Sequence, residues 1–147
     1  MLSKYPPALL PPVTVHVNVE SEAAPEEVWD LYAQPKRWKE WAPHIRAPRN
    51  LGNPEVEPGA SGRVHLAGFA PVWAEVTAKR PGQSWTWRVG LVELTHTVAP
   101  RSGGGSTIGL EMRAPVPMEM AIRMSYAPIT KKLLKRLARK AEANPRP

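Results

Sequence analysis

The feature of this sequence that most constrains its fold is a long alternation of apolar and polar residues between about residues 44 and 114. Such period-two alternation is typical of strands with one buried and one solvated face. Turn segments such as Pro81-Gly82 and Gly103–Gly105 interrupt it at intervals that suit an antiparallel meander. The pattern predicts strands at about 44–51, 61–68, 71–79, 83–91, 92–100 and 106–114.

Elements of other kinds flank this predicted sheet. Residues 13–20 alternate without interruption and predict one further strand. Pro25 suits the first turn of a short helix, and Pro35 begins a second one. The last predicted helix spans about 118–143, with an interruption at Pro128, because proline lacks the N–H that a helical hydrogen bond requires. The expected order is strand, two short helices, six strands and one long helix.

Length and composition narrow the class of protein. A chain of 147 residues has the usual size of one domain. We expect a flexible arm at 1–12, a single domain at 13–143 and a tail at 144–147. Eighteen prolines argue against a helical bundle, and the absence of cysteine excludes disulfides, thiolate metal sites and thiol nucleophiles. The sequence therefore predicts a cytoplasmic α+β protein.

The net charge of +7 is concentrated on the last predicted helix. On a helical wheel, six basic side chains fill one half and apolar side chains fill the other, which needs a partner surface such as the concave side of the sheet. The basic half predicts weak contact with polyanions or a membrane surface, without specific nucleic-acid recognition, because no aromatic side chains interleave with the cations. The basic residues are Lys131, Lys132, Lys135, Arg136, Arg139 and Lys140.

Alternation also assigns side chains to the inner face of the sheet. The inward set is apolar or aromatic, Ala78 included, and its one titratable member is His96. This composition is typical of a site that buries a small ligand. Arg63 and Arg88 are expected to face outward. The predicted ligand-binding residues are Val64, Leu66, Val76, Trp85, Trp87, Leu94, His96, Ile108, Leu110, Met112, Ile122 and Tyr126.

Several of these side chains have two interpretations. His96 can orient a ligand carbonyl or act as a general base, or it is a core histidine with a hydrogen-bonded neighbour. Trp85 and Trp87 can stack on a planar ligand or simply fill the core. Tyr32 and Tyr126 can offer a phenol at the cavity mouth or cap the core with a polar tip.

The sequence predicts neither a metal site nor a cofactor. The four histidines, His16, His44, His65 and His96, lack the i, i+4 pairing with an intervening acid that typical zinc helices show. The glycine run Gly103–Gly105 joins two strands and is not followed by a lysine, so it is not a phosphate-binding loop.

Short sequence segments occur in a suggestive order along the chain. They include Ala24–Leu31 after the first strand, Arg37–Trp41, Leu94–His96 and Tyr126–Pro128. In this order the chain resembles the START-like, or Bet v 1-like (SRPBCC), superfamily, and in particular its small bacterial polyketide cyclase/dehydrase-like branch. The resemblance covers about residues 13–143. It implies a helix-grip fold, in which a seven-stranded curved antiparallel sheet wraps around a long C-terminal helix, with two short helices after the first strand.

The resemblance also implies a cavity between the sheet and the last helix. The leading hypothesis is binding of an apolar or amphipathic, ring-containing molecule such as a lipid, a polyketide or an isoprenoid-like compound. The alternative is a polyketide cyclase or dehydratase-type lyase in which His96 and a tyrosine, Tyr32 or Tyr126, act as acid and base. A third hypothesis is an adaptor that binds another protein. We expect a monomer or a weak homodimer.

Overall fold

The order of elements in the computed structural model follows the predicted order. The structure describes residues 12–46, 48–66, 71–116, 120, 124 and 126–143. The elements are β1 (Val13–Ser21), α1 (Pro25–Ala33), the 3₁₀ helix η2 (Pro35–Glu40), β2 (Ile45–Arg46), β3 (Ser61–Leu66), β4 (Val72–Arg80), β5 (Ser84–Val89), β6 (Val92–Pro100), β7 (Ser106–Ala114) and α3 (Ala127–Ala143).

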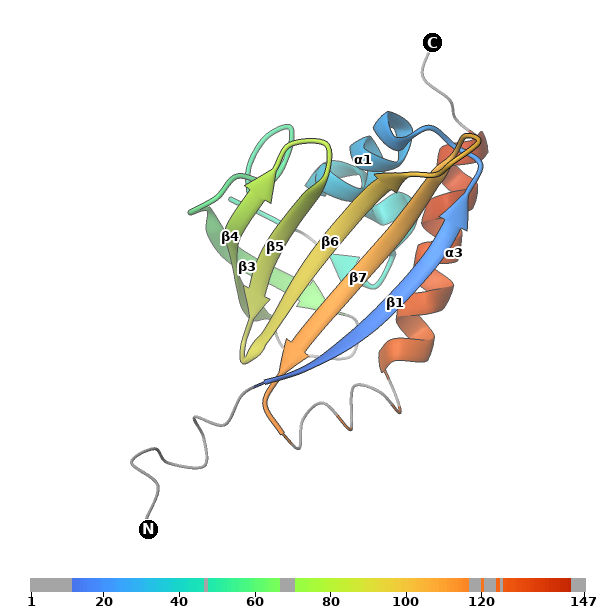
Figure 1. The fold of residues 1–147 in the computed structure, drawn as a ribbon. Coiled ribbons are helices and arrows are strands. Elements are labelled where there is room, and N and C mark those ends of the chain that lie inside the picture. Colours follow the sequence, from blue (N-terminus) through green and yellow to red (C-terminus); the bar gives the residue numbers. More distant parts are fainter. Residues whose placement is uncertain are drawn as a thin grey trace.

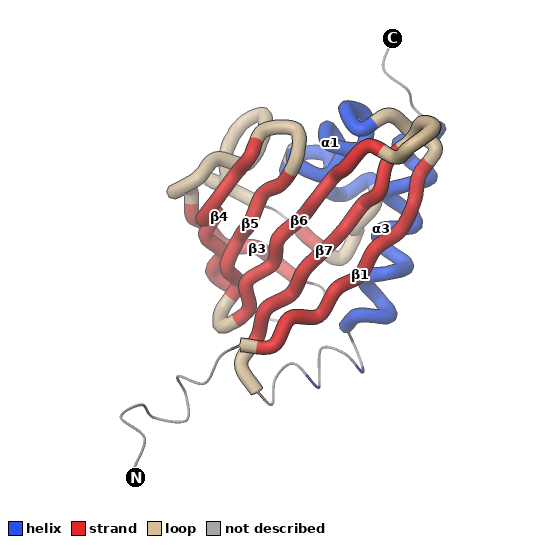
Figure 2. Tube along the Cα trace, in the orientation of Figure 1, coloured by secondary structure: helices blue, strands red, loops and turns tan. Residues whose placement is uncertain are grey.

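The strands form one curved sheet of seven in the order β1-β7-β6-β5-β4-β3-β2, and every pairing is antiparallel. Strands β3 to β7 pair with their neighbours in sequence. Strand β1 pairs with β7 along its whole length, from Val13 opposite Ala114 to Ser21 opposite Ser106. Figures 1 and 2 show α1 and α3 on the same side of this sheet. The curved sheet and its C-terminal helix confirm the helix-grip fold.

Helix α3 packs on the sheet through the half of its surface predicted to be apolar. Leu134, Leu137, Ala138 and Ala141 are buried, as is Thr130. Burying each leucine stabilises the fold by about 1.5–3 kcal/mol relative to its exposure to water. The six basic side chains of the opposite half are all exposed.

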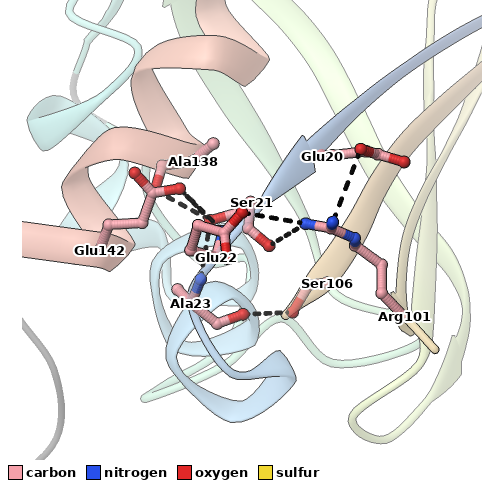
Figure 3. A network of polar contacts seen from close by, with 8 residues as sticks. All are labelled: Glu20, Ser21, Glu22, Ala23, Arg101, Ser106, Ala138 and Glu142. Carbon is pink, nitrogen blue, oxygen red and sulfur yellow. Dashed lines mark hydrogen bonds and ion pairs between the residues drawn. The ribbon is translucent and has the colours of Figure 1, made fainter. Parts of the chain in front are cut away.

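One polar network fastens the C-terminal end of α3 to the corner between β1 and α1 (Figure 3). The Ser21 hydroxyl lies 3.1 Å from the carbonyl oxygen of Ala138 and 3.0 Å from Oε2 of Glu142. Glu142 Oε2 also accepts a hydrogen bond from the backbone N–H of Glu22 at 2.8 Å. On the opposite side, the Arg101 guanidinium donates to the Ser21 carbonyl at 3.1 Å. These contacts hold this end of the helix against the sheet.

Two details of the sheet differ from the prediction. The strand expected at 44–51 contains only Ile45–Arg46, because Pro48 cannot donate a ladder hydrogen bond and Asn50 adopts a positive φ of 62°. Ala78 is exposed, although it was predicted to face inward. A register shift between Val76 and Ala78 reverses the alternation beyond it.

The bulge in β4 has an electrostatic consequence. It leaves the side chain of Lys79 only 11% exposed, and the ammonium group pairs with Glu55 at 3.0 Å. Strict alternation would have placed Lys79 on the outer face.

The interruption predicted in the last helix falls at the limit of the described residues. Helix α3 begins at Ala127, and the two residues described just before it, Met124 and Tyr126, have π-helical geometry, which is one form that an interruption near Pro128 can take. Most of the preceding limb predicted from residue 118, Ile122 included, lies outside the described residues.

Candidate ligand-binding site

A small cavity lies between the concave face of the sheet and the N-terminal half of α3. Its volume is about 40 Å³. Aromatic and aliphatic side chains dominate its wall, and the described part of the lining contains no acid, lysine or arginine. The lining residues are Tyr32, Trp41, His44, Ile45, Trp87, Leu94, His96, Leu110, Tyr126, Thr130, Leu133 and Leu134.

Two tryptophans donate hydrogen bonds to carbonyl groups at the C-terminal end of α1. The indole N–H of Trp41 donates to the Leu31 carbonyl, and that of Trp38 donates to the Tyr32 carbonyl, each at 2.9 Å. Both carbonyls belong to the last turn of α1, whose oxygens have no partner within the helix. The two side chains therefore satisfy this helix end and fix η2 and the residue after it against α1.

His96 sits in an aromatic stack that explains its burial. Its ring lies 3.7 Å from the Trp85 ring at an interplanar angle of 5°, and Trp38 stacks on Trp85 at 5.6 Å and 10°. The nitrogen Nδ1 of His96 lies 3.1 Å from the Trp85 carbonyl oxygen. Burial lowers the pKa of His96 to about 3, although the bond to this carbonyl opposes the shift. The neutral ring donates from Nδ1, which leaves Nε2 as an acceptor.

The two candidate tyrosines differ in what their hydroxyls do. Tyr32 is fully buried, and its hydroxyl donates to the Gly109 carbonyl at 2.8 Å. Burial raises its pKa well above the usual value, with a smaller contribution from Tyr126. Burial also raises the pKa of Tyr126, and the neighbouring Thr130 hydroxyl opposes that shift. Both phenols therefore remain protonated at neutral pH.

Polar atoms without a protein partner gather around this cavity. In the part of the chain that the structure describes, four buried side-chain atoms lack a hydrogen-bond acceptor or donor of suitable geometry, namely His44 Nε2, Trp85 Nε1, Trp87 Nε1 and Thr130 Oγ1. Three of the four belong to residues that line the cavity. Buried polar groups are normally satisfied, so this local concentration requires an explanation.

The structure divides the predicted site residues into three groups. Six meet at the cavity, namely Tyr32, Trp87, Leu94, His96, Leu110 and Tyr126. Five lie in the buried core without lining the cavity, namely Val64, Val76, Trp85, Ile108 and Met112. Leu66 pairs with Ile45 at the end of β3, and Ile122 lies outside the described residues.

Six lining residues were not predicted from the sequence, namely Trp41, His44, Ile45, Thr130, Leu133 and Leu134. The sequence did contain a pattern that indicates the three of these residues that lie in α3. Leu133 and Leu134 belong to the apolar half of the helical wheel, and Thr130 stands one turn before Leu134. The segment after η2 carries no comparable periodicity, so nothing in the sequence placed His44 at the cavity.

Larger hollows lie on the outer face of the sheet and on the molecular surface. One of about 420 Å³ is lined by Arg49, Asn50, Ser61, Gly62, Arg63, His65 and Trp73. It is open to solvent and mostly polar or charged, and Trp73 is 58% exposed. Arg63 and Arg88 are exposed on this face, as predicted.

The described residues contain no group of three His, Asp or Glu side chains close enough together to bind a metal ion. Nor does any helix of the described residues have the length and hydropathy needed to cross a bilayer.

Comparison with known proteins extends the structural description. A family model described as polyketide cyclase / dehydrase and lipid transport matches residues 12–142. No curated protein matches the sequence significantly.

Three similar crystal structures share the fold. Protein MLL2253 from Mesorhizobium loti superposes with a TM-score of 0.74 at 16% identity, covering 91% of this chain and 100% of that one. DynU16, from the dynemicin biosynthetic locus, has a TM-score of 0.70 at 22% identity, and the match covers 88% of this chain but 47% of DynU16. Ara h 8.0201 has a TM-score of 0.68 at 15% identity, covering 90% and 99%.

Proposed function

Because the chain belongs to the polyketide cyclase/dehydrase and lipid transport family of the SRPBCC superfamily, we propose that it binds an apolar or amphipathic, ring-containing small molecule between the sheet and α3. The family supports a ligand-binding or cyclase-type role in general. The observation that carries the finer proposal is the lining of the internal cavity, which combines aromatic and aliphatic side chains with a few polar atoms and no acid, lysine or arginine among its described residues. Small-molecule sites typically have this composition.

The cavity volume of about 40 Å³ means that binding requires the site to open. Sites for small molecules usually enclose about 300–1,000 Å³. Thr130, Leu133 and Leu134 belong to the N-terminal half of α3, whereas the network around Ser21 and Glu142 holds its C-terminal end. We propose that α3 tilts about this fastened end, and that the ligand selects the open state.

A cyclase or dehydratase activity is the second candidate, because His96 and Tyr126 line the same cavity. An efficient general base has a pKa near the working pH. With its pKa lowered to about 3 by burial, His96 is a weak base at pH 7. The Tyr32 hydroxyl already donates a hydrogen bond to the Gly109 carbonyl. These features favour binding over acid–base catalysis.

The proposal is tested by filling the cavity from within. Leu110 lines the cavity from β7 and is 5% exposed. Leu110→Trp is expected to weaken binding of the neutral fluorescent probe N-phenyl-1-naphthylamine at least about 10-fold, because the larger side chain occupies the site. Leu91→Trp is the matched control, since Leu91 is 72% exposed and does not line the cavity.

Circular dichroism and thermal unfolding establish that both variants are folded. Probe binding to Leu91→Trp should equal that of the wild type. Equal probe affinity in folded Leu110→Trp, or no probe binding to the wild-type protein at all, would contradict the proposed site.

A further inference from the structure

The partnerless polar atoms at the cavity restrict what kind of ligand fits there. Trp87 is 6% exposed, yet its indole N–H lacks a suitably placed partner among the described residues, whereas the buried Thr130 hydroxyl has only a contact with the Tyr126 hydroxyl. Leaving a buried hydrogen-bonding group unpaired is unfavourable. A ligand that pairs these groups therefore gains an interaction that a hydrocarbon of the same shape does not.

The chemistry of these groups sets the polarity of the matching ligand atom. An indole N–H is only ever a donor, whereas a threonine hydroxyl can donate or accept. His44 adds a ring nitrogen, Nε2, that also lacks a partner in the described chain. Burial lowers the pKa of His44, so its ring is neutral at pH 7 and supplies no positive charge. The obligatory donor, Trp87, requires an acceptor on the ligand.

The charge of the lining restricts the ligand further. Among the described lining residues there is no lysine or arginine, and both histidines are neutral at pH 7. A carboxylate entering this site would lose its hydration without gaining a counter-ion, which is strongly unfavourable. A neutral oxygen has no such penalty.

We infer that the ligand presents a neutral carbonyl-type oxygen, as in a ketone, quinone or ester, to the indole N–H of Trp87 in this cavity. The Thr130 hydroxyl and His44 assist, and the aliphatic wall formed by Leu94 and Leu110 receives the apolar body. This inference rests on the proposed function and names the class of its ligand.

Three naphthalenes of nearly equal shape separate the chemical classes. They are 2-acetylnaphthalene, 2-ethylnaphthalene and 2-naphthoate, titrated into the protein at pH 7 by isothermal calorimetry. We expect the ketone to bind about 5-fold more tightly than the hydrocarbon, and the carboxylate to bind at least about 10-fold more weakly than the ketone, as expected for one neutral hydrogen bond and an unpaired charge.

The chain offers a matched control for the role of Trp87. Trp87→Phe removes the N–H and keeps an aromatic ring, and should lower the ketone-over-hydrocarbon preference about 5-fold, to nearly equal affinities. Trp85→Phe removes an equally partnerless N–H two residues away, but Trp85 does not line the cavity. It should leave the preference within about 2-fold of the wild-type value. Thr130→Val, which is close in shape to threonine, provides a second test and should lower the preference in the same direction.

The possible failures are distinguishable. If the ketone and the hydrocarbon bind the wild type equally, or if Trp87→Phe keeps the wild-type preference, the inference is wrong while the proposed function stands. A carboxylate that binds as tightly as the ketone also overturns it. If none of the three naphthalenes binds, the proposed function itself fails.

Discussion

The burial of His96 predicts a specific loss of stability in mild acid. The pKa of His96 falls from its ordinary value of 6.5 to about 3 in the folded protein, because burial penalises the charged ring. Between these values the unfolded chain takes up a proton that the folded chain refuses. The contribution of His96 to stability is therefore complete above pH 6.5 and is lost progressively as the pH falls towards 3.

The size of this effect follows from the same two values. Between these two values, each unit by which the pH falls lowers the free energy of unfolding by about 1.36 kcal/mol. Lowering the pH from 7 to 5 should therefore reduce the free energy of unfolding by about 2 kcal/mol through His96 alone. This is a large fraction of the 5–15 kcal/mol that stabilises a typical domain.

Urea denaturation at pH 7 and pH 5 measures this effect when the wild type is compared with His96→Gln. The glutamine amide can still donate to the Trp85 carbonyl but cannot titrate. We expect the wild type to lose about 2 kcal/mol more than His96→Gln between the two pH values, because His44 and the carboxylates contribute equally to both proteins. Equal losses in the wild type and His96→Gln would refute a buried, neutral His96.

Two further predictions concern α3. Replacing Lys131, Lys135 and Arg139 together with glutamine should weaken binding to vesicles containing phosphatidylserine about 100-fold, because each cation contributes about 1 kcal/mol near an anionic surface. A flotation assay measures this binding. Unchanged binding would exclude the basic face of α3 as the membrane contact. Glu142→Ala removes the acceptor of the Ser21 and Glu22 contacts and should lower the free energy of unfolding in urea by about 1 kcal/mol. A change within experimental error would show that the corner network does not fasten the helix.

Much of the fold could be predicted because hydrophobic periodicity reports burial directly. His96 and Leu110 were placed on the inner face by alternation alone, and both are buried. The apolar half of the last helix was assigned in the same way. The alternation failed at Ala78, because a single bulge shifts every later side chain to the other face and leaves no clear mark in the sequence.

The residues of the candidate site were harder to predict from the sequence, because the site depends on contacts between distant segments. Alternation leaves Trp85 with two interpretations, stacking on a ligand or filling the core, and in the structure Trp38 and His96 stack on its ring. His44 comes from an irregular segment without periodicity. The size of the cavity depends on how Thr130 and Leu134 pack against the sheet, which no local pattern specifies.

The proposed function is binding of a small apolar molecule between the sheet and α3. It is tested most directly by the indole N–H resonances of the six tryptophans during titration with N-phenyl-1-naphthylamine. Trp87 lines the internal cavity, whereas Trp73 lines the open hollow on the outer face. We expect the Trp87 resonance to shift to saturation while the Trp73 resonance stays unchanged. A saturating shift of Trp73 with Trp87 unchanged would contradict it.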